Sequence, residues 1–514
     1  MSVTKAAQYN LRPPATAGRS YSYKVQAQHG VASIEGNRSK VVEFHVPCSS
    51  NTFLDQSQSY LEFKLKARGG SGTTGLRLDS SAGSLLHRIE VYHGSNLLES
   101  IDGYNVLHSM MMDATVDNTT RNGVMSALMG TSVSPSAPGV ATSATALTST
   151  EYSSALGTTP PTEDASEFHS GLTLTASSAA SVSADLTNIY RNQKLLKTYI
   201  DNNLVGGNTG RREGHNLFGS PGASAGVTLQ EVQAEDSTQI ALPIALSGLL
   251  SPASKKYLPL FAMQADSLRI QITLEDPEKA LVCTNGTTCK YVLEDMGYVC
   301  QFVELTSEVC GAILQDGLAN GGGALKISSE SFRGFESTLP TESTGFSIQV
   351  PARFSSLNSI YSCWRQTDNV SAISKKSITG RVQPQNLGYQ YRIGSSLTPS
   401  QPVKSSPAAL MEVLKTFNAV SASNFQSSIT ETNWDVLTDP SSAQTNDTGA
   451  FFVGLETSLF SNAADIVDSG KQTISEVVQL EGTCTKMSGT MTVNNFARFD
   501  MAVIVSDGLA TTVF

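Results

Sequence analysis

The sequence predicts an all-β protein in which two β units follow one another along the chain. Strict alternation of apolar and polar residues occurs in both halves, which is typical of strands with one buried and one solvated face. The 514 residues exceed the roughly 250 to 300 that one hydrophobic core organises. Charged residues make up 16%, below the ~25% of average soluble proteins. Ser, Thr, Gly and Asn fill the difference, which favours strands with long uncharged loops over a helical enzyme.

Six segments carry the alternation, three in each of the two units. The side chains expected on the buried faces are Val42, Phe44 and Val46; Leu61, Phe63 and Leu65; Leu268, Ile270, Ile272 and Leu274; Phe346, Ile348 and Val350; Phe451, Val453 and Leu455; and Phe499, Met501, Val503 and Val505. Polar residues stand between them, for example Glu62, Lys64 and Lys66. Both halves are therefore predicted to be β-sheet domains.

Two segments have a helical period instead. The expected buried positions are Val106, Leu107, Met110 and Met111 in the first segment, and Leu410, Val413, Leu414 and Phe417 in the second. Ser406 is the expected N-cap of the second helix, with Pro407 at the first helical position. The lead-ins "IEVYHGSNLLESIDGY" and "YQYRIGSSLTPSQPVKSS" are alike in kind, which predicts a duplicated topology with little residue identity.

Composition divides the chain into an arm and two units. We expect an extended N-terminal arm over residues 1–24, a first unit over 25–310 and a second unit over 311–514. A Ser/Thr/Ala/Pro-rich insert over about 114–237 is too long for an ordinary loop, so we expect a surface structure standing on the first unit. A shorter counterpart covers about 418–449. Between the units, "TSEVCGAILQDGLANGGGAL" predicts a short turn of helix and a glycine-rich connector.

Gly70, Gly72 and Gly75 match the G-x-G-x-x-G pattern of dinucleotide-binding loops. Such a loop must leave a strand and enter a helix whose N-terminus meets the pyrophosphate. Here the following residues, "LRLDSSAGSLLHRIEVYHG", have no helical face and lead into another alternating strand. We therefore predict a hairpin loop rather than a phosphate site.

Ser224 lies in "GASAG", which matches the G-x-S-x-G nucleophile elbow. The elbow belongs to a strand-to-helix turn, and in that fold an Asp and then a His follow the serine. All seven histidines precede Ser224 in the sequence, and its surroundings are rich in Gly and Ser. A loop is the better interpretation, although a different order of triad residues stays open.

The remaining candidates for chemistry are also weak. His87 and His93 straddle the strand "RIEVY", but spacing supplies at most a pair of ligands where zinc needs four. Glu275, Asp276 and Glu278 are neighbouring carboxylates, and Pro277 among them indicates a turn that ends a strand, so we expect these acids to be solvated. Two tryptophans, Trp364 and Trp434, are too few for a typical carbohydrate-binding platform. We nominate no catalytic, cofactor-binding or metal-ligating residue and expect no enzyme activity and no cofactor.

The distribution of charge limits the classes of partner that we expect this chain to bind. The formal net charge is -10, and no basic run exceeds the pair Arg211 and Arg212, so we expect no direct sequence-specific binding of nucleic acid. No stretch reaches the ~18 apolar residues of a membrane span, and the first residues lack the apolar core of a secretory signal. Seven widely spread cysteines favour buried thiols, with a disulfide between Cys283 and Cys289 left open. These features describe a structural protein better than an enzyme.

Three segments carry a resemblance to a known family. They are "SLLHRIEVYHGSNLLESIDGYNVLHSMMMD", "SGLLSPASKKYLPLFAMQADSLRIQITLED" and "GYQYRIGSSLTPSQPV". They resemble the corresponding strand and helix segments of double jelly-roll major capsid proteins of icosahedral double-stranded DNA viruses, closest to those of polinton-like viruses and virophages. The similarity is patchy but spans most of residues 40–505, and its motifs are packing patterns.

The resemblance implies two tandem eight-stranded jelly rolls standing upright in a virion shell. Three chains would form a homotrimer with a pseudo-sixfold outline, and trimers would tile the capsid beside penton and minor or cement proteins. Assembly would take place inside the host cell. The insert 114–237 would then be an outward tower, and residues 1–24 an arm that lies under a neighbour.

Two alternatives stay open at this point. A secreted glycan-binding or glycan-cleaving β-sandwich protein would be expected to show a signal peptide, paired disulfides and more tryptophan. A minor virion protein such as a spike or penton would be expected to have a single roll of ~200 residues, whereas this chain has room for two.

Overall fold

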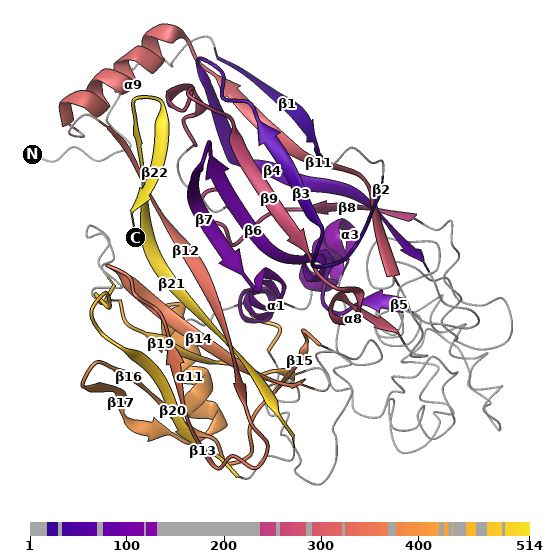
Figure 1. Cartoon of the computed structure of the whole chain (residues 1–514), viewed down its shortest axis with the longest axis vertical. Helices are drawn as coiled ribbons and strands as arrows, with labels where there is room; N and C mark the ends of the chain where they lie inside the picture. The colour runs from indigo at the N-terminus through magenta and orange to yellow at the C-terminus, as the bar shows by residue number, and fades with distance from the viewer. Residues whose placement is uncertain are drawn as a thin grey trace, which may run out of the picture.

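The computed structural model describes residues 18–28, 33–68, 76–117, 120–130, 237–252, 257–283, 290–320, 324–367, 377–420, 426–429, 434, 449–458, 470–485 and 489–513. These residues form two β units (Figure 1). No sheet in the described part contains strands from both units.

The framework of the first unit consists of two antiparallel sheets. The strands of its main framework are β1 (Arg19–Gln26), β3 (Val41–Val46), β4 (Thr52–Arg68), β6 (Leu86–His93), β7 (Asn96–Asp102), β8 (Ser237–Leu242), β9 (Leu268–Leu274) and β11 (Lys290–Glu304). They pair in the orders β1-β11-β4-β8 and β3-β9-β6-β7. A short strand, β2 (Ser33–Glu35), also pairs with β11.

The second unit repeats this arrangement. Its framework strands are β12 (Leu325–Leu339), β13 (Gly345–Val350), β14 (Leu357–Gln366), β16 (Gly388–Ile393), β17 (Ser396–Val403), β19 (Val453–Glu456), β20 (Val478–Thr483) and β21 (Met491–Ser506). One sheet has the order β13-β20-β16-β17, and in the other β12, β21, β14 and β19 are successive partners. The small strands β15 (Gly380–Val382), β18 (Gly449–Ala450) and β22 (Leu509–Val513) extend the second sheet.

The two units have one topology. When the eight framework strands of each unit are numbered along the chain, both units have one sheet in the order first, eighth, third, sixth and another in the order second, seventh, fourth, fifth. Early and late strands therefore lie side by side in each sheet, as in an antiparallel jelly roll of two Greek keys. The fold is a double jelly roll, and the predicted duplication of topology is confirmed.

The alternation correctly placed most of the core. β3, β9 and the second half of β21 bury every other side chain, and Val42, Phe44 and Val46 are fully buried. The segment 451–455 differs, because Phe452 is buried as well as Phe451. Both rings pack against Trp434, at centroid distances of 5.0 Å from Phe451 and 5.8 Å from Phe452. The strand itself begins only at Val453.

The first predicted helix is α1 (Tyr104–Thr115), which is buried from Tyr104 to Ala114. The expectation of a one-sided apolar face was therefore too narrow. The helix follows β7 of the first roll and lies between the two rolls in Figure 1. Because both rolls cover it, polar side chains on its second face are removed from solvent as well.

The second predicted helix is α11 (Ser406–Thr416), which follows β17 as α1 follows β7. Its N-cap is Ser405 rather than the predicted Ser406, since the Ser405 hydroxyl accepts a hydrogen bond from the Ala408 amide at 3.3 Å. Pro407 is consequently the second helical residue. The buried stripe contains Ala409, Val413 and Thr416, and the predicted positions at 410, 414 and 417 are half-buried.

In the sequence, α9 (Ser307–Asn320) connects the two rolls, and it is longer than the expected turn. Its Cys310 joins Phe53 and Phe261 in a small satellite core at the end of the first roll. At the N-terminus, β1 starts at Arg19, so pairing with β11 begins inside the range 1–24 expected as an arm. Residues 1–17 lie outside the described part.

Several predicted loops fall only partly within the described residues. The first insert contributes the end of α1, η3 (Arg121–Met125) and α3 (Ser126–Met129), and 131–236 lie outside the described residues. Gly70, Gly72 and Gly75 lie outside them too. The flanking strands β4 and β5 (Leu76–Leu78) do not form a hairpin in the described part, because β5 pairs with β10 (Leu281–Cys283) while β4 pairs with β11 and β8. The predicted hairpin was therefore wrong, and the connection joins two sheets.

Candidate functional site

The seam between the two rolls gathers buried charged side chains from distant parts of the sequence. On the first-roll side these come from α1, β7 and the segment before β6. On the second-roll side their partners come from β12, β15 and β22. Burying a charge costs free energy unless it is paired and hydrogen-bonded, so each group of contacts below constrains how the rolls meet.

The first of these contacts is a triad of buried charges around Asp113 of α1. Arg381 of β15 and Arg121 of η3 each bind one oxygen of the Asp113 carboxylate. The Arg381 side chain is 0% exposed. Burial opposes ionisation of Asp113, but the two guanidiniums outweigh it and hold the pKa of this carboxyl below its ordinary value. A charge of the first roll is thereby paired with a charge of the second.

The C-terminal end of α1 also holds part of the second insert. The Asp113 backbone carbonyl accepts hydrogen bonds from the Ser428 amide at 3.0 Å and the Ser427 hydroxyl at 2.9 Å. The Ser428 hydroxyl in turn accepts from Arg121 at 3.1 Å. The described parts of the two inserts therefore meet at Asp113.

Asp79, just before η2 (Ala82–Leu85), makes a second link between the rolls. Its carboxylate accepts hydrogen bonds from the Ile378 and Thr379 amides and, at 2.5 Å, from the Thr379 hydroxyl. Asp79 is fully buried. Amide and hydroxyl donors satisfy both carboxylate oxygens. Asp79 therefore holds the second-roll segment that leads into β15 against the first roll.

Glu99 of β7 makes a third link and is also buried. It accepts hydrogen bonds from the Gly248 amide at 2.7 Å, from the Leu249 amide at 3.3 Å and from the Ser247 hydroxyl. The hydroxyl of Ser331, on β12 of the second roll, completes the set. Burial raises the pKa of Glu99, although these four donors act in the opposite direction.

The C-terminal strand β22 reaches back to the first roll. His93 of β6 accepts a hydrogen bond at Nδ1 from the Ala510 amide (3.1 Å). Its Nε2 lies 3.0 Å from the Met263 carbonyl oxygen, so the neutral tautomer with the proton on Nε2 satisfies both contacts. Asn96 donates to the Ala510 carbonyl oxygen at 3.1 Å. Side chains of one roll thereby bind backbone groups of β22 in the other.

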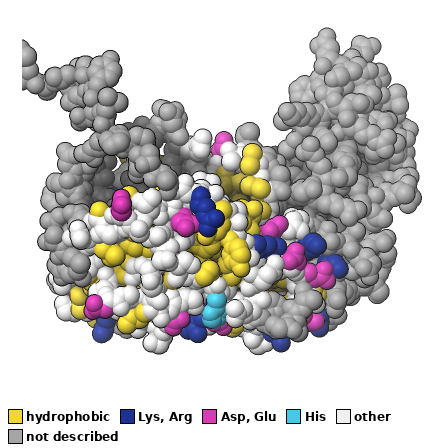
Figure 2. All heavy atoms as spheres, turned by 90° about the horizontal axis from the view of Figure 1, so that it is seen from above, with side chains coloured by type: hydrophobic (Ala, Val, Ile, Leu, Met, Phe, Trp, Pro, Cys, Tyr) yellow, Lys and Arg dark blue, Asp and Glu magenta, His cyan; other side chains and the backbone are white. Residues whose placement is uncertain are grey.

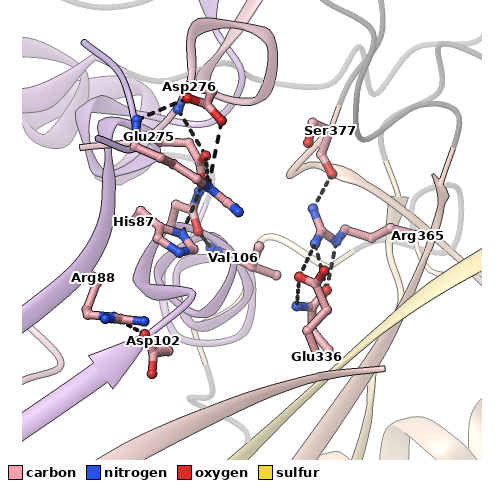
Figure 3. Close-up of polar contacts among 12 residues, drawn as sticks. His87, Arg88, Asp102, Val106, Glu275, Asp276, Glu336, Arg365 and Ser377 are labelled. Atoms are coloured by element: carbon pink, nitrogen blue, oxygen red, sulfur yellow. Dashed lines mark hydrogen bonds and ion pairs between the residues drawn. The ribbon is translucent and has the colours of Figure 1, made fainter. Parts of the chain in front are cut away.

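A small cavity lies in the seam beside the N-terminus of α1. Figure 3 shows Glu275 and His87 on one side, Arg365 on the other and Val106 between them. Glu275 is 1% exposed and accepts hydrogen bonds from Arg38 (2.7 Å) and Asn105 (2.8 Å), while His87 Nδ1 lies 3.1 Å from its carboxylate.

The expectation that Glu275 is solvated was therefore wrong. Although burial opposes ionisation, His87 and Arg38 lower the pKa of Glu275 to about 2. Asp276 is half-buried and Glu278 is exposed. Pro277 begins the short helix α8 (Pro277–Ala280), so the strand ends where the sequence predicted. The carboxylate is charged and fully engaged by donors, which makes it a poor general base.

The other candidates from the sequence do not converge. His87 contacts Glu275 whereas His93 contacts the Met263 carbonyl, so the two histidines serve different parts of the seam. Among the described residues no group of three or more potential metal-ligating side chains comes together. Ser224 and residues 284–289, which include Cys289, lie outside the described residues, and Cys48, Cys300, Cys310, Cys363 and Cys484 are free thiols.

Two further observations concern the surface. No helix in the described ranges is both long and apolar enough to cross a bilayer. Figure 2 shows one end of the molecule, where hydrophobic side chains are exposed between scattered charges. Large exposed hydrophobics of the described residues include Tyr23, Leu97, Leu509 and Val513. Such apolar surface is available for contacts with other chains.

The residues that join the rolls were not found from the sequence. Asp79, Glu99, Asp113 and Arg381 look like ordinary polar residues in the sequence. One signal was present, because Glu99 and Asp113 interrupt the apolar runs "NLLESI" and "MMMDA". A charge inside an apolar segment suggests a buried partner, but it does not identify that partner.

Comparisons with known proteins agree with this fold. No protein-family model and no curated protein matches the sequence. Among solved structures, the chain is similar to the Faustovirus major capsid protein (TM-score 0.54, 10% identity, 98% of this chain and 93% of that chain). It is also similar to a chain of the PBCV-1 virus capsid (TM-score 0.53, 9% identity, 97% of each chain). A chain of the Sputnik virophage gives a TM-score of 0.52 at 12% identity, over 96% of this chain and 88% of that chain.

Each alignment covers both rolls, and the identities are so low that it is the fold that is shared. The chain has the double jelly-roll fold of viral major capsid proteins.

Proposed function

We propose that this chain is a major capsid protein whose homotrimer, with a pseudo-hexameric outline, tiles the icosahedral shell of a double-stranded DNA virus. The observation that carries the proposal is the tandem repeat of one topology, which gives a single chain two equivalent rolls. Three such chains supply six rolls, so a threefold assembly approximates sixfold symmetry. The proposed role is then structural, because the chain contributes the geometry of the shell and does not catalyse a reaction.

The buried seam supports this role. A capsomer must transmit lateral load between its rolls without opening. Here Asp79, Glu99 and Asp113 of the first roll are each bonded to the second roll away from solvent. Removing one partner of a buried ion pair such as Asp113 with Arg381 costs several kcal/mol, typically about 3 to 5. The two rolls therefore behave as one building block.

The pair of rolls also has exposed apolar side chains that can contact other chains. Exposed hydrophobics such as Tyr23 on β1 and Leu509 on β22 lie on strands of different rolls. A stable obligate interface buries roughly 2,000 to 5,000 Å² in total. We propose that these surfaces contact neighbouring copies in the trimer and that penton and minor capsid proteins fill the remaining positions of the virion.

The alternatives now have less support. Both tryptophans are buried, Trp364 at 0% and Trp434 at 4% exposure, so neither offers an exposed platform for sugar stacking. A spike or penton of one roll does not account for two rolls with the same topology. We infer a structural protein of the virion without enzymatic activity.

Native mass spectrometry of the purified chain tests the proposal. We expect a dominant species of three times the 54.5 kDa chain mass, and negative-stain images with a hexagonal outline. A trimer should persist on dilution to nanomolar concentration, because obligate interfaces are large and apolar. A monomer at micromolar concentration, or particles without threefold symmetry, would contradict the assignment.

A further inference from the structure

The duplicated topology gives each element of the seam an equivalent in the other roll. On the first-roll side, the seam contains β7, the fifth framework strand, and the helix α1 that follows it. Their equivalents in the second roll are β17 and α11. On the second-roll side, the seam contains β12, the first framework strand, whose equivalent is β1. Figure 1 shows β1 and β17 far apart, on opposite outer sides of the molecule.

The two fifth strands have bulges at equivalent places but differ in burial. β7 has its bulge at Leu98, and β17 has a longer one over residues 399–402. Leu98 and the following Glu99 are buried, and the second roll covers them through the hydroxyls of Thr512 and Ser331. In β17, Pro399 is half-buried and the next three residues are exposed. The surface that the seam covers on the first roll is therefore open on the second.

The two helices show the same contrast. α1 is buried from Tyr104 to Ala114, and Arg381 of the second roll binds its Asp113. The apolar side chain of Met411 in α11 is instead 41% exposed. Methionine is enriched in the buried centres of protein interfaces. β17 and α11 together form a surface of the second roll that we call the outer side.

The β1 edge of the first roll is rich in aromatic side chains. β1 is the terminal strand of its sheet and pairs with β11. Tyr21 and Tyr23 contact the ring of Phe302 at centroid distances of 5.6 Å and 6.3 Å, and Tyr23 is still 52% exposed. The guanidinium carbon of Arg19 lies 4.9 Å from the centre of the Tyr21 ring. Tyrosine and arginine are the residue types that most often dominate the energy of an interface.

We propose that the outer side of the second roll binds the β1 edge of the first roll in a second copy of this chain. The inference rests on the homotrimer proposed above and identifies its two contact surfaces. The contact would repeat between chains the arrangement that the seam has within one chain. Because the two surfaces differ, the interface is heterologous, and such an interface forms a ring when its rotation closes, here after three copies.

The proposed contact consists of packed side chains rather than a continuous sheet. Pro399 and Pro402 of β17 have no amide hydrogen to donate to a neighbouring strand. The seam has the same character, since β7 and β12 belong to different sheets although Ser331 of β12 contacts Glu99 of β7.

Substitutions on each surface test the proposal. Met411→Arg alters the outer side and Tyr23→Arg alters the β1 edge, each at an exposed position. We expect either substitution to raise the concentration at which the trimer dissociates by about thirtyfold or more, as is typical of a central interface residue. Leu97→Arg is the matched control, because Leu97 is also 41% exposed but belongs to neither surface. Its trimer is expected to dissociate at the wild-type concentration.

Mixing the two variants tests the head-to-tail polarity. The Met411→Arg chain keeps an intact β1 edge, and the Tyr23→Arg chain keeps an intact outer side. One intact contact can therefore form between them, and both remaining surfaces of the pair carry a substitution. Native mass spectrometry of the mixture is expected to show a heterodimer of twice the 54.5 kDa chain mass. Because each variant must be folded to form it, this species also excludes misfolding as the cause of dissociation.

Hydrogen exchange provides an independent measurement. In Met411→Arg, the β1 amides over Arg19–Gln26 are expected to exchange faster than in wild type, although the substitution lies in the other roll. Wild-type trimers that survive both substitutions, or a mixture without heterodimer, would refute these surfaces and leave the homotrimer standing. A wild-type monomer would instead contradict the proposed homotrimer itself.

Discussion

Replacement of Asp113 by Asn tests whether buried charges hold the two rolls together. The carboxylate is the shared partner of Arg381 and Arg121, and the Arg381 side chain is fully buried. Asn keeps the size of the side chain but removes the negative charge and places an amide donor among donors. Because two guanidiniums then lose their counter-charge, we expect the free energy of unfolding to fall by about 3 to 5 kcal/mol.

The assay is urea unfolding followed by tryptophan fluorescence, since Trp364 and Trp434 are both buried in the native state. Glu481→Gln is the matched control, because its pair with Arg392 lies at the surface and is screened by solvent. Equal midpoints for the two variants would refute the reasoning. The pH dependence of the free energy of unfolding provides a second test.

The pKa of Asp113 is lower in the folded state than in the unfolded state. Its stabilisation is therefore present in full above the unfolded value of 3.8 and is lost as pH falls through the folded value. Wild type and Asp113→Asn are expected to differ most near neutral pH and to converge in acid. A difference that stays constant down to strong acid would show that the charge is not the cause.

Three further predictions concern single positions. Glu275→Gln is expected to cost about 3 kcal/mol at pH 7, from a pKa of about 2 against 4.5 in the unfolded chain. In wild type this stabilisation is complete above pH 4.5 and is lost as pH falls through about 2, and a stability profile flat over that range would contradict it. Ser405→Ala removes the N-cap of α11 and is expected to cost about 1 kcal/mol in urea unfolding, whereas no change would place the cap elsewhere. Gly311→Ala in α9 puts a methyl group into open space and is expected to stabilise by about 1 kcal/mol, measured in the same way, and a loss of stability would mean that this face of α9 is covered.

The duplication explains why two helices with different surroundings occupy equivalent places. α1 follows β7, and α11 follows β17, and each comes after the fifth framework strand of its roll. α11 packs on β19 with one face and leaves Met411 exposed, as an amphipathic helix does. α1 instead became the centre of the contact between rolls, so its polar residues Asn105 and Asp113 have buried partners.

The sequence alone determined the local features of this protein. Strand positions, their buried faces and the two helices follow from periodicity, because the side-chain period of a strand or helix is a property of a few consecutive residues. The turn at Pro277 was predictable for the same reason. The error at Ser405 was one residue, which is the usual uncertainty at a helix end.

Only the tertiary structure decided which charges are buried and which partners they have. Asp113 and Arg381 are 268 positions apart, and Asp79 and Thr379 are 300 apart, so no local pattern connects them. The solvation of Glu275 could not be predicted either, because it depends on Arg38 and His87, which come from other parts of the chain. Burial of a charge is a property of the whole fold, since its free energy is set by every group that replaces water around it.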